Sequence, residues 1–510
     1  MNLESMLLQL FRLKSCVFAE RDHPTDRSNA TKQNSKKRNR IDRILFVRKE
    51  AITLMRTLIQ NGTLVRSQGI EQADILVENG FIKRIASGIT EQADEVIDAG
   101  GKLVFAGFID THTHFDLDLG VTITADNFIT GTRAAVLGGT TTVLDFATQD
   151  RGMTMQDALD LWHKKAEGSS CNYGFHMAIS EWDGERAAEV EFMVAQGVTS
   201  FKMYMVYDAM RLNDGEIYAA LKHMAALNCI SGVHCENYDV LNERIHELNS
   251  IGMRSPLAHP LSRPNAVEAE AVSRLMRIGQ LAKAPVWVVH LSTHEGLEEA
   301  RRARARGQEV YLETCPQYLV LDDARYGDPD AEKFIMSPPL RKAEDQDALL
   351  SAMGSGEIDV IGTDHCSFMM SQKALGGGEF SKTPNGGAGV QNRAQLIYTY
   401  AVRTGRITLQ QMAAMMSENA AKMFGMYPHR GILHEGAEAD IAIYDPTGES
   451  TISYRTNAHR CDNSPYEGMK VFGSVSDVLL GGRHVVKSGK LIEEGKGRFV
   501  FRKASGRYRA

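Results

Sequence analysis

Short apolar segments alternate with helix-like segments across residues 106–425, and this alternation limits the possible folds more than any other feature of the chain. Eight segments of strand character occur there, at 108–110, 140–146, 174–180, 199–204, 230–234, 286–291, 310–314 and 360–363. Helix-like sequence separates most of them; before the sixth, Val272, Leu275 and Met276 have helical spacing. Eight alternating units over about three hundred residues are what a (β/α)8 barrel requires.

The two ends of the chain have β character instead. Asn61-Gly62 and Asn79-Gly80 separate apolar segments near the start, which is a strong hairpin signal. Similar segments return at 439–446, 450–454 and 478–491. We therefore expect an α/β fold, a TIM-type barrel with a small β-sandwich domain built from both chain ends. The competing fold, an open doubly wound sheet, is disfavoured because no G-x-G-x-x-G loop follows an early strand.

These patterns divide the chain into five expected parts. They are a disordered or non-native leader at 1–54, sandwich segments at 55–105 and 426–500, the barrel at 106–425, and a tail at 501–510. The leader is basic and polar with little periodicity, so we expect the folded protein to begin near Met55. An organellar transit peptide is the alternative, and the acidic residues of this segment weigh against it.

Charge and cysteine content exclude several classes of protein. A net charge of -6 disfavours nucleic acid as the main partner. No apolar run approaches the roughly 18 residues that a membrane helix needs. The seven cysteines are scattered and form no C-x-x-C pair, which indicates reduced thiols. We therefore expect a cytoplasmic protein with no nucleic-acid or membrane partner.

Residues that commonly bind metals lie at the carboxyl ends of four predicted strands, the rim where barrels of this kind carry their chemistry. His112 and His114 follow the first strand two positions apart, so both imidazoles can face one point. His234, His290 and Asp364 follow the fifth, sixth and eighth strands. Each has an ordinary alternative, a core histidine or, for Asp364, a helix N-cap. Together they predict a metal site.

Lys202 interrupts a strand of bulky residues in SFKMYMVYD. A protonated amine is a poor metal ligand, and a lysine that points into an apolar barrel is normally costly. Reaction of the neutral amine with CO2 would give a carbamate, an anionic group long enough to bridge two metal ions. The alternatives are a Schiff-base lysine and a surface lysine that snorkels, and both leave the histidines unexplained.

Eight motifs in this order and spacing carry a family resemblance. They are FIDTHTH, SFKMYMVYD, GVHCEN, VVHLST, ETCPQYL, MSPPLR, GTDHC and FSKTPNGG. The chain from about Met55 to about Val500 resembles the amidohydrolase superfamily, and within it the dihydropyrimidinase and D-hydantoinase branch. The segment TNAHRCDNSPYEG is similar to the C-terminal segment of phenylhydantoinase-like members. The leader has no counterpart in that branch.

The resemblance implies a binuclear zinc site. His112, His114 and Asp364 would hold one ion, His234 and His290 the other, and Lys202, as N6-carboxylysine, would bridge both. It also implies hydrolytic ring opening of cyclic ureides, which are 5-substituted hydantoins and dihydropyrimidines, to N-carbamoyl amino acids by a hydroxide held between the ions. Asp364 would act as general base and then acid, and Tyr207 would stabilise the oxyanion. Ser337 and Asn385 would bind the substrate, and the enzyme would be a homotetramer.

Three related functions compete with this interpretation. A dihydroorotase-type site typically has an arginine where this chain has Asp116, which would repel a substrate carboxylate. An allantoinase-type activity stays open, although the Lys202 to Tyr207 spacing favours the dihydropyrimidinase branch. A non-catalytic, dihydropyrimidinase-related interaction protein is disfavoured because all six ligand positions are intact.

Two features bear on substrate preference. The family more often has Pro and Glu where this chain has Ala388 and Gln391, so the conformation of that loop is less certain than that of the metal site. The apolar or aromatic side chains expected near the ring 5-position are Phe115, Leu117, Leu119 and Tyr204. They predict that bulky aromatic 5-substituents are accepted.

Overall fold

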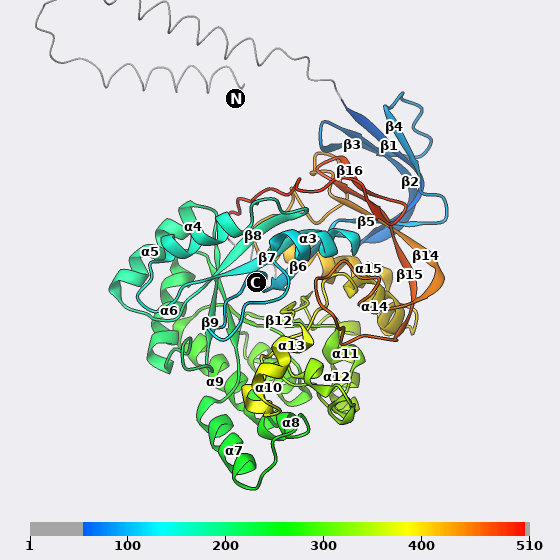
Figure 1. Cartoon of the computed structure of the whole chain (residues 1–510). Coiled ribbons are helices and arrows are strands. Elements are labelled where there is room, and N and C mark those ends of the chain that lie inside the picture. Colours follow the sequence, from blue (N-terminus) through cyan, green and yellow to red (C-terminus); the bar gives the residue numbers. More distant parts are fainter. Residues whose placement is uncertain (1–54, 505–510) are drawn as a thin grey trace, which may run out of the picture. The chain divides into compact units, whose positions relative to one another are not determined.

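A computed structural model describes residues 55–504 of the chain (Figure 1). The predicted leader, 1–54, and residues 505–510 of the predicted tail lie outside the described residues. Two sheets organise the rest, one of eight strands and one of nine.

The eight-stranded sheet is the predicted barrel, and its strands neighbour one another in chain order. They are β6 (Phe108–Thr113), β7 (Thr140–Thr148), β8 (Asn172–Ala178), β9 (Ser200–Tyr204), β10 (Ile230–His234), β11 (Val286–Val288), β12 (Val310–Thr314) and β13 (Val360–Ile361). Every neighbouring pair is parallel. A parallel bridge between Thr113 and His365 joins the last strand's end to the first. The prediction of a (β/α)8 barrel is confirmed.

Helices connect these strands and cover the outside of the sheet (Figure 1). The longer ones are α3 (Phe128–Leu137), α4 (Met155–Lys165), α5 (Gly184–Ala195), α6 (Asp214–Ala226), α7 (Tyr238–Ser250), α9 (Asn265–Ala282), α10 (His294–Ala305) and α12 (Ala343–Gly354). Shorter helical segments are α8 (Ala258–Ser262), α11 (Gln317–Val320), α13 (Met370–Lys373), α14 (Arg393–Ile397), α15 (Leu409–Ala413) and α16 (Asn419–Met423). Val272, Leu275 and Met276 are buried on α9, as their helical spacing predicts.

Strand β6 runs further than predicted, and β13 stops earlier. Parallel pairing with β7 continues to Thr113, whose hydroxyl donates to Asp145 Oδ2 at 2.8 Å. His112 therefore lies inside the strand, and His114 follows its end. At the other end of the sheet, the Thr363 amide donates to a side chain, Asp110 Oδ1 at 3.1 Å, so regular pairing ends at Ile361.

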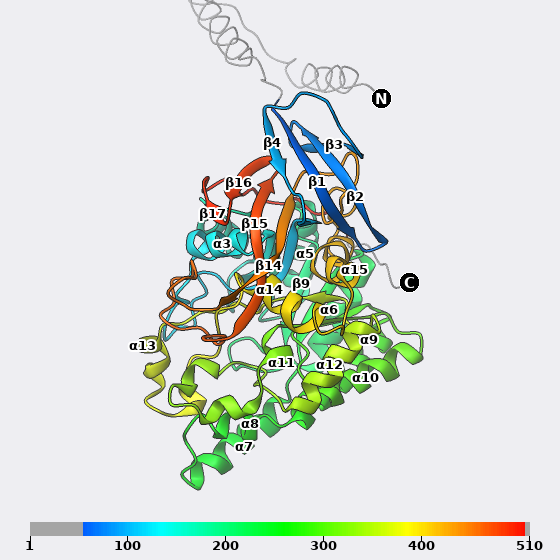
Figure 2. The same cartoon turned by 90° about the vertical axis from the view of Figure 1, so that its right-hand side faces the viewer.

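The second sheet joins the two ends of the described chain (Figure 2). Its N-terminal strands are β1 (Arg56–Arg66), β2 (Gly69–Glu78), β3 (Phe81–Ala86), β4 (Glu95–Asp98) and β5 (Leu103–Ala106). Its C-terminal strands are β14 (Ile441–Thr451), β15 (Lys470–Leu480), β16 (Arg483–Lys487) and β17 (Lys490–Leu491). The two groups meet where β5 pairs antiparallel with β14. This arrangement confirms the predicted fold class, whereas the exact domain boundaries stay predictions.

Apolar side chains fill the inside of the barrel, so it is a packed core that leaves chemistry to its rim. Leu144, Phe146, Trp287 and Tyr311 are among these side chains and are fully or almost fully buried.

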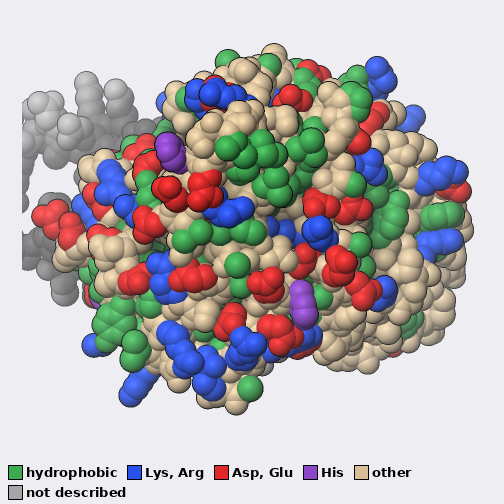
Figure 3. Space-filling view, turned by 90° about the horizontal axis from the view of Figure 1, so that it is seen from below, with side chains coloured by type: hydrophobic (Ala, Val, Ile, Leu, Met, Phe, Trp, Pro, Cys, Tyr) green, Lys and Arg blue, Asp and Glu red, His purple; other side chains and the backbone are tan. Residues whose placement is uncertain are grey.

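Within residues 55–504, every helix falls short of the length or the apolar character that a bilayer crossing demands. On the face shown in Figure 3, acidic and basic side chains are interspersed among the described residues, in keeping with the small net charge.

Candidate metal centre and ring-binding site

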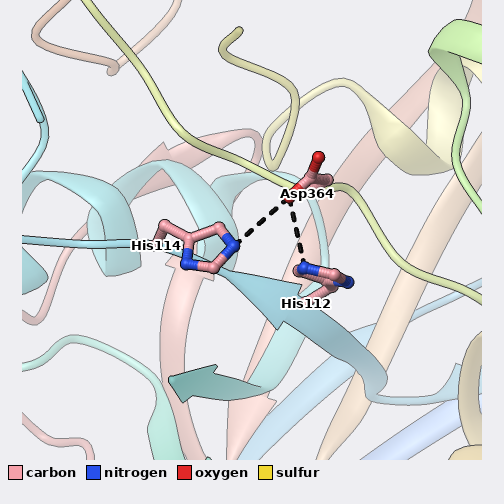
Figure 4. A group of neighbouring side chains, drawn as sticks. All are labelled: His112, His114 and Asp364. Carbon is pink, nitrogen blue, oxygen red and sulfur yellow. Dashed lines mark ion pairs between the residues drawn. The ribbon is translucent and has the colours of Figure 1, made fainter. Parts of the chain in front are cut away.

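Three of the predicted ligands converge on one point at the carboxyl end of the barrel (Figure 4). Asp364 follows β13, and its Oδ1 lies 3.2 Å from His112 Nε2 and 3.3 Å from His114 Nε2. The three ligand atoms all lie within 4.8 Å of one another. Two imidazoles and a carboxylate at this spacing form a candidate site for one divalent ion.

The other two histidines continue this cluster. The ring centroids of His114 and His112 lie 5.1 Å apart, those of His112 and His290 5.3 Å, and those of His290 and His234 4.5 Å. Residues from β6, β10 and the end of β11 therefore form one continuous group. The structure brings together all four histidines that the sequence singled out.

Lys202 lies on β9 and is almost completely buried beside this group. Its Nζ is 4.8 Å from the centroid of the Phe146 ring, which also packs against His112 and His114 at 4.6 and 4.9 Å. Burial lowers the pKa of Lys202 to about 8, although the charge of Asp364 opposes this shift. A neutral amine, the form that reacts with CO2, is therefore accessible near neutral pH.

The donor set fits a divalent metal. Within residues 55–504, the buried atoms without a hydrogen-bond partner include His112 Nε2 and His290 Nδ1. Burial holds the pKa of His112 and of His290 well below the usual value, so both rings are neutral, which is the form that binds a metal. Nitrogen and carboxylate donors in a buried cluster are what zinc prefers.

Two buried carboxylates that sequence reasoning missed support these histidines. Glu313 on β12 lies 2.6 Å from His112 Nδ1, and it also accepts from the Thr111 hydroxyl at 2.7 Å and the His290 amide at 3.1 Å. The position of Glu313 in the sequence could have indicated this role. Glu313 is the last residue but one of the seventh strand, close to the position at which ligand-type residues occur on other strands.

Glu236 is the second of these carboxylates, and it supports His234. Its Oε2 lies 2.7 Å from His234 Nε2 and accepts from Arg263 Nη1 at 2.5 Å. Glu236 follows His234 by two residues, so both side chains leave the strand end on the same side. A carboxylate bonded to the second ring nitrogen fixes the orientation and tautomer of a metal-binding histidine.

The predicted substrate-binding residues form a second group next to the histidines. The Tyr207 ring centroid lies 5.3 Å from that of His234. Ser337 Oγ donates to Asn385 Oδ1 at 3.0 Å, and Ser337 also forms a hydrogen bond with Tyr207. Burial raises the pKa of Tyr207, so its hydroxyl stays protonated and can donate. These three residues come from different loops, and only the fold brings them together.

The backbone is strained where several of these side chains leave the barrel. Tyr207, His290 and Asp364 have φ angles of 74°, 38° and 52°, a region that residues other than glycine rarely adopt. Each follows a barrel strand, where the chain turns away from the sheet. Such strain persists only where surrounding contacts hold it, and it concentrates at functional sites.

Two of the sequence features related to substrate preference have other roles in the structure. Phe115 is fully buried, with its ring 5.5 Å from Phe128 and 5.3 Å from His365, so it belongs to the core and not to a ring-binding surface. Gln391 Oε1 accepts from the Ala458 amide at 2.7 Å, which ties its loop to the C-terminal segment. Leu119 is exposed and Tyr204 is partly exposed, so both stay available to a substrate.

A (β/α)8 barrel that carries a His-His-Asp cluster at one rim defines the class as the metal-dependent hydrolase barrels. The chain belongs to the amidohydrolase family, whose model matches residues 103–485. Membership of this family implies the use of a divalent metal, and the cluster of His112, His114 and Asp364 is a candidate site for it.

Named relatives match the chain over almost all of their own length. D-hydantoinase from Geobacillus stearothermophilus is 40% identical over 459 residues, which cover 89% of this chain and 98% of the relative. D-phenylhydantoinase from Escherichia coli (strain SE11) is 40% identical over 455 residues, 88% of this chain and 98% of the relative. The resemblance to the dihydropyrimidinase and D-hydantoinase branch is confirmed.

Solved structures agree with the sequence relatives. Dihydropyrimidinase from Brevibacillus agri NCHU1002 has a TM-score of 0.88 at 39% identity, and the match covers 89% of this chain and 100% of that chain. L-hydantoinase from Arthrobacter aurescens has a TM-score of 0.80 at 29% identity, covering 88% and 100%. Proteins named for either enantiomer share this fold, so the fold alone does not set a stereochemical preference.

Proposed function

We propose that this protein hydrolyses the ring of cyclic ureides, 5-substituted hydantoins and dihydropyrimidines, to N-carbamoyl amino acids. The observation that carries the proposal is the position of Tyr207, Ser337 and Asn385 beside the histidine cluster. Hydrogen-bond donors and acceptors there can bind the N–C(=O)–N edge of a ring while its carbonyl faces the metal ligands. Relatives named D-hydantoinase and D-phenylhydantoinase, each 40% identical, support the same substrate class.

The metal centre in this proposal contains two zinc ions. His112, His114 and Asp364 would hold one, His234 and His290 would hold the other, and Lys202, as a carbamate, would contribute a ligand to both. Supporting this arrangement are the continuous histidine group and the burial and lowered pKa of Lys202. When bound, such a pair of ions supplies a nucleophilic hydroxide near neutral pH and polarises the scissile carbonyl.

Asp364 is the proton carrier. Burial opposes ionisation, but His112 and His114 together hold the pKa of Asp364 below its usual value, so it is a carboxylate that can accept a proton. It takes the proton of the attacking water and gives it to the ring nitrogen as the C–N bond breaks. Its backbone position directly after β13 directs the carboxylate toward both histidines.

Tyr207 donates its hydroxyl proton in a hydrogen bond to the oxygen that becomes negative in the tetrahedral state. Its raised pKa keeps the donor proton in place across the working pH range. By comparison with other oxyanion donors, this bond contributes about 3 kcal/mol to the transition state. Ser337 and Asn385 hydrogen-bond the N–C(=O)–N edge of the ring and so hold the substrate in the site.

The competing functions differ in the residues they need. Asp116 accepts from the Phe128 amide at 3.3 Å and keeps a carboxylate where a dihydroorotase-type site needs a cation. An allantoinase-type activity stays open, although the Lys202 to Tyr207 spacing favours the dihydropyrimidinase branch. A non-catalytic role is disfavoured because the predicted ligands are all present.

The cytoplasmic location and the homotetramer stay predictions. The six described cysteines are free and buried, which agrees with a reducing compartment.

A substrate panel tests this function directly. Protein purified with zinc and bicarbonate is incubated with hydantoin, 5-phenylhydantoin, dihydrouracil and allantoin, and ring opening is measured as N-carbamoyl product. We expect turnover of the hydantoins, with 5-phenylhydantoin preferred over dihydrouracil. Turnover of allantoin alone would favour the competing activity. Protein that holds two zinc ions and opens none of these rings would contradict the proposal.

A further inference from the structure

Lys373 is a buried cation that the metal centre does not use. It ends the short helix α13, yellow in Figure 1, and is only 1% exposed. Its ammonium group donates to three backbone carbonyls, those of Ile335 at 2.8 Å, Pro384 at 2.7 Å and Gly386 at 2.7 Å. An ammonium has three N–H groups, so these bonds use its full donor capacity.

The three carbonyls belong to the two segments that carry the ring-binding residues. Ile335 precedes Ser337 by two residues, and the other two carbonyls flank Asn385 on either side. The Gly386 amide also donates to the Ile335 carbonyl at 2.9 Å, which joins the two segments directly. The ammonium therefore sits at the junction from which Ser337 and Asn385 project toward each other.

Burying a charged amine in this place has a cost that the carbonyl bonds must offset. Burial lowers the pKa of Lys373 to about 7, while the thiols of Cys366 and Cys461 and the carboxyl of Glu332 act in the opposite direction. Charge-assisted bonds to three carbonyls favour the protonated amine and are stronger than neutral ones. Removing the amine takes the common donor away from all three carbonyls. The Ile335 carbonyl still accepts from the Gly386 amide, so the two segments keep one direct bond and lose their common anchor.

We propose that Lys373 is a positioning residue of the ring-binding site, which sets the separation of Ser337 and Asn385 so that both contact one edge of the substrate ring. The inference rests on the proposed function. The N–C(=O)–N edge is common to all cyclic ureides, whatever their 5-substituent. A defect at this anchor therefore weakens binding of different ureides by the same factor, and it leaves the metal ligands in place.

Lys373→Met removes the donors and keeps the length of the side chain. We expect KM for hydantoin and for 5-phenylhydantoin to rise by the same factor, about ten- to hundred-fold, as for a lost bond to a charged group. We expect kcat to change less than about three-fold, because the ring still meets the same catalytic groups once bound. Bound zinc should stay at the wild-type level. Lys382→Met is the matched control, since Lys382 lies in the same loop, is exposed and forms a surface ion pair with Glu379 at 3.0 Å.

A double variant shows whether Lys373 acts through the ring-binding residues. If it does, Lys373→Met combined with Asn385→Ala raises KM by less than the product of the two single effects, because both changes remove one contact. Fully multiplicative effects would overturn the inference, as would a wild-type KM in an active, zinc-loaded K373M enzyme.

Lys373→Arg is the second variant and decides the question if K373M does not fold. A guanidinium keeps the charge, but its planar fork cannot direct three donors at carbonyls arranged around one ammonium. We expect a raised KM in K373R as well, and a wild-type KM would overturn the inference. If the wild-type enzyme opens no cyclic ureide at all, the proposed function fails first, which is a different outcome from an unchanged KM in the variants.

Discussion

Glu313→Gln tests whether a buried carboxylate holds the predicted metal-binding histidines in place. Glu313 is fully buried, and its two oxygens accept from the Thr111 hydroxyl and the His290 amide and contact the His112 ring at 2.6 Å. A glutamine keeps one acceptor oxygen and turns the other position into an NH2 donor. The glutamine can keep its oxygen at the position that His112 and His290 share and turn its NH2 toward the Thr111 hydroxyl, but it carries no negative charge. His112 therefore loses the charge-assisted bond that fixes its ring.

The size of the effect follows from what this bond does. Loss of such a partner typically lowers metal affinity about 10- to 100-fold, which corresponds to roughly 1.4–2.7 kcal/mol. We expect E313Q to bind zinc more weakly by that factor, measured by competition with a chromophoric chelator. Thermal unfolding of the metal-free protein reports separately whether the variant is folded.

Glu298→Gln is the control for the loss of a carboxylate as such. Glu298 lies on α10, on the surface of the protein, and pairs there with Arg301 at 2.6 Å. Its removal should leave the zinc affinity unchanged. Wild-type zinc affinity in folded E313Q would refute the reasoning, because the buried carboxylate would then contribute nothing to the histidines it touches.

Three further predictions concern other parts of the molecule. Lys202→Ala should lose bound metal and activity and regain part of both when small carboxylates are added; a fully active variant would exclude a bridging carbamate. Tyr207→Phe should lower kcat by about 10²- to 10³-fold with zinc content unchanged, and a kcat near wild type would remove its oxyanion role. His484 is partly desolvated, which lowers its pKa, but hydrogen bonds to Asp477 and Glu95 raise it overall. The protonated ring therefore stabilises the fold fully below about pH 6.5, and this contribution is lost as pH rises through the higher folded-state pKa. Denaturant titrations should show His484→Gln destabilised more at pH 6 than at pH 9, and a difference independent of pH would contradict the assignment.

Much of the barrel could be read from local patterns, because strand and helix periodicities are properties of adjacent residues. Strands β10 and β12 match their predicted ranges, whereas the other six differ by one to three residues at one or both ends. For β6 and β13, the ends depend on hydrogen bonds from Thr113 to Asp145 and from Thr363 to Asp110. These partners are 32 and 253 residues away in the chain, so no local window contains the signal.

The sequence could likewise predict part of the candidate site and not the rest. Residues at the carboxyl ends of parallel strands must lie at one rim, so the positions of His112, His234 and Asp364 along the chain were enough to predict that they gather. The direction of a side chain is a different matter. Phe115 follows His114 directly, yet it points into the core against Phe128, because the backbone turns after β6 and helix α3 covers it.

The sequence by itself determined the class of fold, the rim at which the candidate site lies and the types of candidate ligand gathered there. Only the tertiary structure decided which groups support them. Glu313 reaches His112 from a strand 201 residues away, and Lys373 bonds carbonyls up to 38 residues distant. The physical reason is that a buried charge is stable only where several partners converge on it. That convergence is a property of the packed chain, and no spacing along the sequence encodes it.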